Sequence, residues 1–181
     1  MQEAVTTNPK GEVHMKQNVQ HVGSRLKKES MDFSWYITGF TDGEGCFSIS
    51  FNRRAKLQTG IEIRPSFSIG QNKRSLQVLK DIHTYFGCGA IRFGKSDQLY
   101  KFEVRSVGDL MKRVIPHFQK FPLQTNKQLD FNIFTQVCEL IYQSKHLNVT
   151  YLEQIINQSY LMNESGKRKY SKEELLKILT R

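Results

Sequence analysis

The feature that most constrains this chain is a short apolar segment, Trp35–Gly45, which ends in two acids interleaved with glycines. Its pattern predicts a helix in which Gly39 and Gly43, four residues apart, lie on the same face. Because glycine has no side chain, such a face lets a second helix backbone approach closely. Glu44 would then lie at the end of a helix–helix contact, where a carboxylate is a natural ligand for a hard divalent cation.

The segment ITGFTDGEG, residues 37–45, resembles the nine-residue motif of the LAGLIDADG homing endonucleases. The middle glycine, both acids and the final glycine match, and the strand-like residues 46–50 follow as they do in that family. The departures are Thr38 and Thr41, which are polar where the family usually has small or apolar residues. The alternative is a buried amphipathic helix with a glycine cap, but the full motif followed by a strand favours the resemblance.

The motif occurs once in the 181 residues. In the LAGLIDADG family, chains with one motif act as homodimers and chains with two act as monomers, so the resemblance implies a homodimer. A lone motif helix also leaves its glycine face without a partner, and an isologous two-fold contact supplies one. The residues expected at this dimer interface are Ile37, Gly39, Phe40 and Gly43.

Apolar periodicity along the chain predicts alternating hairpins and helices. The predicted strands are 46–54, 61–69, 90–93 and 99–105. The predicted helices are 35–42, 73–86, 107–115, 125–142 and 150–162, and the third of these is expected to stop at Pro116. An αββαββα order with further C-terminal helices makes an α+β fold, with an antiparallel sheet covered by helices on one face. This order matches the LAGLIDADG core domain, whose sheet forms a DNA-binding saddle.

The chain divides into three predicted parts. Residues 1–30 are polar and aperiodic, which predicts a mobile extension. Residues 31–165 form the predicted endonuclease domain. Residues 166–181 form a basic C-terminal tail that has room for one short helix.

Cysteine usage and hydropathy bear on the compartment. The three cysteines are scattered and never spaced as CxxC, which argues against a disulfide framework or a zinc site and favours a reducing compartment. No apolar run approaches a membrane span, and the first residues lack a secretory apolar region. We therefore expect no membrane contact and an intracellular protein, in the bacterial cytoplasm or in a chloroplast or mitochondrion that encodes it.

The charge balance and the strand pattern together favour nucleic acid. The chain carries 27 Lys and Arg against 17 Asp and Glu, a formal net charge of +10. Each predicted strand has one apolar and one polar face, and a β-ribbon with strands of ~10 residues, ~33 Å long, fits the major groove of duplex DNA. An ordinary solvated sheet face usually mixes both signs of charge, whereas acids are scarce here. The predicted DNA-binding residues are Ser48, Ser50, Asn52, Arg54, Arg64, Ser66, Ser68, Arg74, Arg92, Lys101 and Arg105.

The resemblance also implies a chemistry: a site-specific, intron-encoded endonuclease that cuts both strands of a long pseudo-palindromic DNA target. It implies Mg²⁺ or Mn²⁺ held by the Glu44 carboxylate and the Gly43 carbonyl, with Gln71 next to the attacking water. It further implies a supporting lysine, which is Lys127 unless Thr125 occupies that position. Two alternatives stay open, an RNA-binding maturase with intron RNA as its partner and a cleavage-dead DNA-binding protein.

Asp42, the first acid of the motif, has a different expected role. It precedes the helix end, so we expect it to cap or anchor the helix rather than to bind metal.

Overall fold

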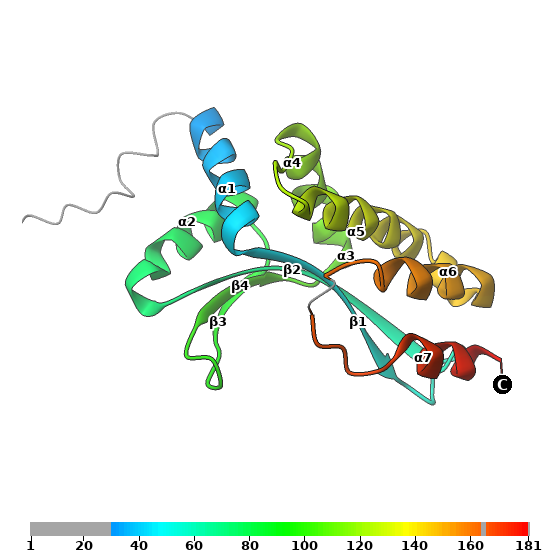
Figure 1. The fold of residues 1–181 in the computed structure, drawn as a ribbon. Coiled ribbons are helices and arrows are strands. Elements are labelled where there is room, and N and C mark those ends of the chain that lie inside the picture. The colour runs from blue at the N-terminus through cyan, green and yellow to red at the C-terminus, as the bar shows by residue number, and fades with distance from the viewer. Residues whose placement is uncertain (1–29, 164–165, 181) are drawn as a thin grey trace, which may run out of the picture.

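The computed structural model describes residues 30–163 and 166–180, and it shows an antiparallel sheet with helices packed on one face (Figure 1). The strands are β1 (Gly45–Arg53), β2 (Ile61–Gln71), β3 (Ala90–Phe93) and β4 (Tyr100–Val104). The helices are α1 (Ser30–Glu44), α2 (Leu76–Phe86), α3 (Val107–Asp109), α4 (Ile115–Lys120), α5 (Lys127–Tyr142), α6 (Val149–Ser159) and α7 (Lys172–Leu179). The αββαββα order and the α+β class are confirmed. The predicted extension 1–30 lies, except for its last residue, outside the described residues.

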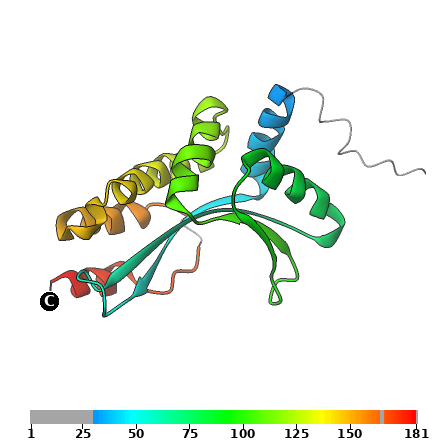
Figure 2. The same cartoon turned by 180° about the vertical axis from the view of Figure 1, so that it is seen from behind.

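The sheet has the strand order β1-β2-β4-β3, and every neighbouring pair is antiparallel. It arches, with α1 to α6 above it, and the opposite side of the arch is free of these helices in both the front and the rear view (Figures 1 and 2). Residues along each strand alternate between the two sides, so one side of the arch is apolar and packed and the other is polar.

A cluster of phenylalanines joins the sheet to the helices. Phe47, Phe67 and Phe102 point from the strands into the core, and Phe118 and Phe134 meet them from α4 and α5. The Phe47 ring centroid lies 5.0 Å from that of Phe67 and 5.3 Å from that of Phe118. Such contacts between large rings bury the apolar side of the sheet and fix where the helices sit. No described helix is long and apolar enough to cross a membrane.

The helix expected to stop at Pro116 continues past it, so that prediction was wrong. A π-helical turn, η4 (Leu110–Val114), links α3 to α4, and the Ile115 N–H bonds to the Leu110 carbonyl. Pro116 therefore falls in the first turn of α4, where a missing N–H is tolerated. The helical stretch ends instead at Lys120.

Residues 166–180, which the sequence set apart as a basic tail, pack on the domain. Helix α7 begins with a capping box in which Ser171 and Glu174 exchange hydrogen bonds. Leu175 is fully buried, and Ile178 lies against Gly60 in the β1–β2 turn. The C-terminal segment thus covers the hairpin of β1 and β2 (Figure 1).

Candidate nucleic-acid interface and cleavage site

The inner face of α1 packs into the core of its own chain. Ile37, Thr38 and Thr41 are at most 1% exposed. The Thr38 hydroxyl donates to the Phe121 carbonyl oxygen at 2.9 Å. Ile37 was also expected at the dimer interface; its side chain is fully buried within one chain, which leaves Gly39, Phe40 and Gly43 as the predicted interface residues on the outer face.

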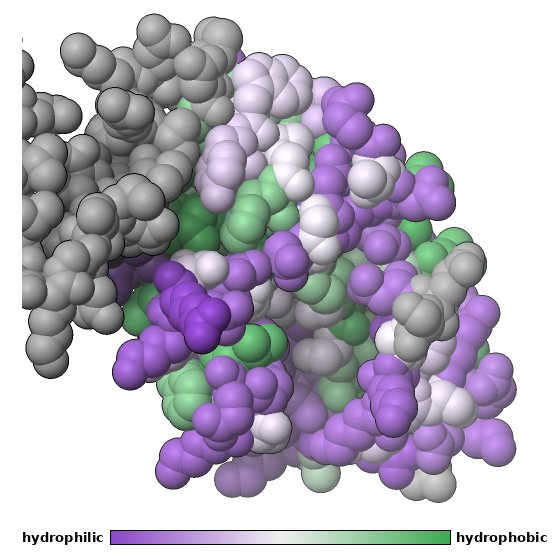
Figure 3. Space-filling model, turned by 60° about the vertical axis from the view of Figure 1, so that its left-hand side comes forward, coloured by the Kyte–Doolittle hydropathy of each residue, from purple (hydrophilic) through white to green (hydrophobic). Residues whose placement is uncertain are grey.

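The outer face of α1 is open. A Cβ atom added at Gly39 or at Gly43 would meet no atom within 4 Å. Trp35 and Tyr36 are exposed on the same side, and the Phe40 ring stacks on that of Tyr36 at 5.6 Å. On the side of the molecule that carries α1, pale and green residues of intermediate and apolar character interrupt the purple polar surface (Figure 3). This face has the small residues and the apolar rim that a close helix–helix contact needs.

A partly buried series of hydrogen-bonded side chains holds α1 in place on its inner side. The Tyr85 hydroxyl lies 2.9 Å from the Ser34 hydroxyl and 2.9 Å from Nδ1 of His117, and Nε2 of His117 lies 3.3 Å from the Thr38 hydroxyl. Burial lowers the pKa of His117 from 6.5 to about 4, so the imidazole is neutral at pH 7. These bonds tie α1 to α2 and α4 and set the direction in which the helix points.

The helix α1 runs directly into β1 at Gly45. A Cβ atom there would lie 2.8 Å from the Thr41 carbonyl oxygen, so only glycine allows this junction. Glu44, the last residue of α1, is exposed, and no described side chain forms a hydrogen bond or ion pair with it. The free carboxylate therefore stands at the helix C-terminus, where the helix dipole adds to its attraction for a cation.

Asp42 anchors the chain before α5, in agreement with its expected structural role. Its carboxylate accepts a hydrogen bond from the Gln124 N–H at 2.8 Å, and from the Thr125 hydroxyl at 2.7 Å and the Thr125 N–H at 3.3 Å. The acid that precedes Gly43 is thus occupied, which leaves Glu44 as the free acid of the motif.

Lys127 makes the reciprocal contact, from the start of α5 to the end of α1. Its Nζ donates to the carbonyl oxygens of Thr41 at 2.8 Å, Asp42 at 2.9 Å and Gly45 at 2.6 Å. An ammonium group has three donors, and all three are used here. This geometry does not support the catalytic role expected for Lys127, because the group closes the helix end. The Thr125 hydroxyl is likewise engaged, with Asp42.

Gln71 is the last residue of β2 and lies opposite Tyr100. Since Gly45 is paired with Ile69, Gln71 stands two residues beyond the level at which α1 enters the sheet. The register thus brings Gln71 and Glu44 to the same end of the β1–β2 pair. Arg74 lies further on, in the exposed turn η3 (Lys73–Ser75), and so it is not on the sheet face.

The strand register places most of the predicted DNA-binding residues on the polar side of the sheet. Ser48 is paired with Ser66, Ser50 with Arg64, and Arg92 with Lys101. Arg54 and Arg105 lie one residue beyond the ends of β1 and β4. Of the other predicted residues, Asn52 and Ser68 also lie on this polar face.

Two acids also belong to this face and hold its arginines. Glu62 lies 3.0 Å from both Arg54 and Arg64, and the hydrogen bonds from Arg54 and then Arg64 lower the pKa of Glu62. Glu103, which the sequence analysis did not assign to this face, bonds Arg105 at 3.0 Å. The two-residue alternation through Lys101, Glu103 and Arg105 was the signal that could have placed it there.

Comparison with known proteins agrees with this geometry. The family model described as LAGLIDADG endonuclease matches residues 37–138. A solved homing endonuclease, I-TnaI, is 33% identical over 81% of this chain and 95% of its own, with a TM-score of 0.71. The archaeal intron-encoded homing endonuclease I-Vdi141I, solved in complex with DNA, is 27% identical with a TM-score of 0.78 and covers 84% of this chain and 97% of its own. The chain therefore belongs to the LAGLIDADG endonuclease family.

The curated relatives are mostly longer. A probable intron-encoded endonuclease 3 of Neurospora crassa is 32% identical over 130 residues, which are 71% of this chain but 24% of that protein. The homing endonuclease I-ApeII of Aeropyrum pernix is 29% identical over 150 residues, which are 80% of this chain and 88% of that protein. This chain thus spans about a quarter of the N. crassa relative and most of the archaeal one.

Proposed function

We propose that this protein is a site-specific DNA endonuclease that cuts both strands of a long target as a homodimer. The observation that carries the proposal is the free carboxylate of Glu44, which stands at the end of an open glycine face and beside a polar sheet face. I-Vdi141I, of which the chain covers 97%, is a DNA-bound homing endonuclease, and this supports duplex DNA as the substrate.

The dimer follows from the outer face of α1. Two copies of the helix, packed across a two-fold axis through Gly39 and Gly43, would bring both Glu44 carboxylates near that axis. Two acids at one axis match a reaction on two DNA strands. Phe40 and the exposed Trp35 and Tyr36 would flank the contact and exclude water from it.

A divalent cation, Mg²⁺ or Mn²⁺, fits this arrangement, with oxygen ligands from the protein and from the DNA. The Glu44 carboxylate and the Gly43 carbonyl are hard oxygen donors at the negative end of a helix. No group of three or more His, Cys, Asp and Glu residues that could hold a metal occurs among the described residues. The second copy and the DNA phosphate would supply the rest. When bound, the cation supplies charge neutralisation and activation of water for phosphodiester hydrolysis.

The other residues act through position. Gln71, at the same end of the β1–β2 pair, would orient the attacking water through its side-chain amide. Lys127 would keep the end of α1 and the junction with β1 rigid, which makes it a positioning residue. The polar sheet face would lie in the major groove, with Arg64, Arg92 and Lys101 among the groups facing base edges and phosphates.

The genetic setting we propose is an intron. One relative is the uncharacterized 50.9 kDa protein in ND4 intron 1 of Podospora anserina, 34% identical over 116 residues. We propose that the protein acts in the compartment where its intron is expressed, a bacterial cytoplasm or an organelle.

The test is cleavage of a plasmid that carries an intronless insertion site, in buffer with Mg²⁺ or with EDTA. The wild type should cut in Mg²⁺ only, Glu44→Gln should bind the site without cutting it, and Glu153→Gln should behave as the wild type. Glu153 is a matched control because it is an exposed acid on α6. Equal cutting by Glu44→Gln and the wild type would refute the proposal.

A further inference from the structure

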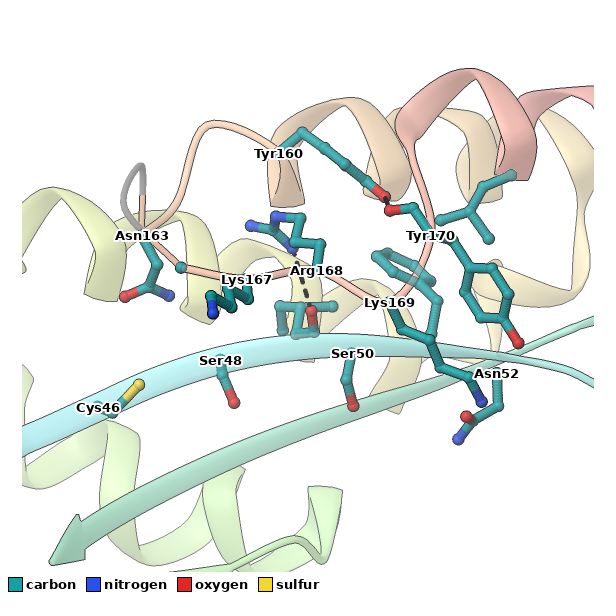
Figure 4. Close-up of a pocket in the computed structure, with 14 residues that line it drawn as sticks. Cys46, Ser48, Ser50, Asn52, Tyr160, Asn163, Lys167, Arg168, Lys169 and Tyr170 are labelled. Carbon is teal, nitrogen blue, oxygen red and sulfur yellow. Dashed lines mark hydrogen bonds between the residues drawn. The ribbon is translucent and has the colours of Figure 1, made fainter. Parts of the chain in front are cut away.

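A groove runs along the outer edge of β1, beside the polar sheet face. β1 is the end strand of the sheet, so one of its edges has no neighbouring strand. Residues 166–170 run along that edge and enclose with it a groove of about 500 Å³. Ser48, Ser50 and Asn52 of the polar face line one side, and the basic run Lys167–Lys169 lines the other (Figure 4).

Arg168 and Asn163 fasten this segment to the sheet. The Arg168 guanidinium donates to the carbonyl oxygens of Ser159 and, at 2.8 Å, Met162, and it reaches the Ile49 carbonyl at 3.5 Å. Nδ2 of Asn163 donates to the Phe47 carbonyl at 2.8 Å. Two free carbonyls of the edge strand are thereby satisfied, which protects the edge from pairing with another chain. The segment therefore has a fixed position relative to the polar face.

The two lysines on either side of Arg168 do not make such hydrogen bonds to backbone carbonyls among the described residues. Lys167 and Lys169 are both exposed, and the Lys169 side chain passes β1 toward Asn52 (Figure 4). The Lys169 ammonium also lies 5.2 Å from the Tyr170 ring centroid. No described residue that lines the groove is acidic. The basic run thus divides into one inward anchor and two outward charges.

We propose that Lys167 and Lys169 form a clamp on the DNA backbone that extends the nucleic-acid interface beyond the edge of β1. This inference rests on the proposed function. The groove and the polar face share Ser48, Ser50 and Asn52, so a duplex lying on that face continues past these lysines. Two ammonium groups with the Asn52 amide beside them match the phosphates of duplex DNA. Such contacts add sequence-independent affinity and fix the register of the protein on its site.

The test is the salt dependence of binding to a 30-base-pair duplex of arbitrary sequence, for which no target need be known. The variant Lys167→Gln/Lys169→Gln is compared with Lys80→Gln/Lys112→Gln, which removes the same charge from exposed lysines of the helical layer. Losing two phosphate contacts should reduce the slope of log Kobs against log salt by about 1.8, which is about 0.9 per contact, whereas the control should keep the wild-type slope. Both variants should keep the wild-type unfolding midpoint, because all four side chains are exposed.

Equal slopes for the two double variants would overturn the clamp while leaving the endonuclease proposal in place. A wild type that binds no such duplex would overturn the clamp, whereas cleavage of the insertion-site plasmid decides the endonuclease proposal separately. A 30-nucleotide single-stranded RNA serves as the second probe. If the wild type prefers this RNA, and only the Lys167→Gln/Lys169→Gln variant loses it, the segment is an RNA contact and the proposal fails.

Discussion

Replacing Gly39 by alanine should change the stability of one chain and the association of two chains in opposite directions. Gly39 lies in the middle of α1, and an added Cβ atom meets nothing within 4 Å in the single chain. Alanine exceeds glycine in helix propensity by about 1 kcal/mol, so the free energy of unfolding of the monomer should rise by about that amount. In a two-fold helix–helix contact through this face, each added methyl group overpacks the interface and destabilises the dimer by about 1–3 kcal/mol.

Because both copies carry the change, the free energy of dimer association should become less favourable by at least about 2 kcal/mol. This raises the dissociation constant of the dimer by about 30-fold. Urea unfolding at protein concentrations below the dissociation constant measures the first effect, and sedimentation equilibrium measures the second. Gly108→Ala is the matched control, since it adds a methyl group to α3 with its nearest neighbour at an ordinary 3.7 Å, away from α1. If Gly39→Ala raises stability and leaves self-association unchanged, the outer face of α1 is not the dimer interface, and the proposed dimer is refuted.

Three further predictions concern the contacts around α1. Lys127→Met removes the ammonium donor from the carbonyls of Thr41, Asp42 and Gly45, and it should lower the free energy of unfolding measured in urea by about 3 kcal/mol. A lysine with a purely catalytic role would leave stability unchanged. The pKa of His117 is about 4 when folded and 6.5 when unfolded, so the unfolded state binds the extra proton and stability should fall by up to about 3 kcal/mol as the pH drops from 6.5 to 4. His117→Gln should flatten this dependence of stability on pH, measured by urea titration. Burial also lowers the pKa of His146, so the contribution of His117 is the difference between the wild type and the variant. Identical pH profiles for the two proteins would contradict the assignment. Thr38→Val should cost about 1–2 kcal/mol because its hydroxyl bonds a buried carbonyl, whereas Thr41→Val should be neutral or stabilising because the buried Thr41 hydroxyl has no hydrogen-bond partner among the described residues; thermal unfolding that ranks the two alike would count against this account.

The apolar–polar alternation of the sequence predicted the strands well, because every second residue of a strand faces the core. The strands expected at 46–54 and 61–69 are observed as Gly45–Arg53 and Ile61–Gln71, since burial along a half-covered strand alternates regardless of what covers it. The stop at Pro116 was wrong because a π-helical turn before the proline, packed through the buried Leu110 and Val114, redirects the backbone hydrogen bonds. The helix propensities of individual residues do not reflect such tertiary packing.

Helix faces were harder to predict than strand faces. Ile37 and Phe40 are both apolar and both lie in the motif, yet Ile37 is fully buried within the chain and Phe40 is only partly covered. A helix that packs on its own domain and also offers a face to a partner has apolar residues on both sides, so composition cannot distinguish them. The helix–sheet packing decides which side is inside.

The sequence by itself determined that a glycine-faced helix ends in an acid, because that property depends only on residues 37–45 and their spacing. It also determined the polar face of the sheet, because a strand alternates strictly. The tertiary structure decided what each charge does. Lys127 closes a helix end more than 80 residues earlier in the chain, and Arg168 anchors the edge of β1 at Ile49, 119 residues away. Contacts between residues so distant in sequence leave no local pattern, and they decide which charges hold the fold together and which remain exposed on its surface.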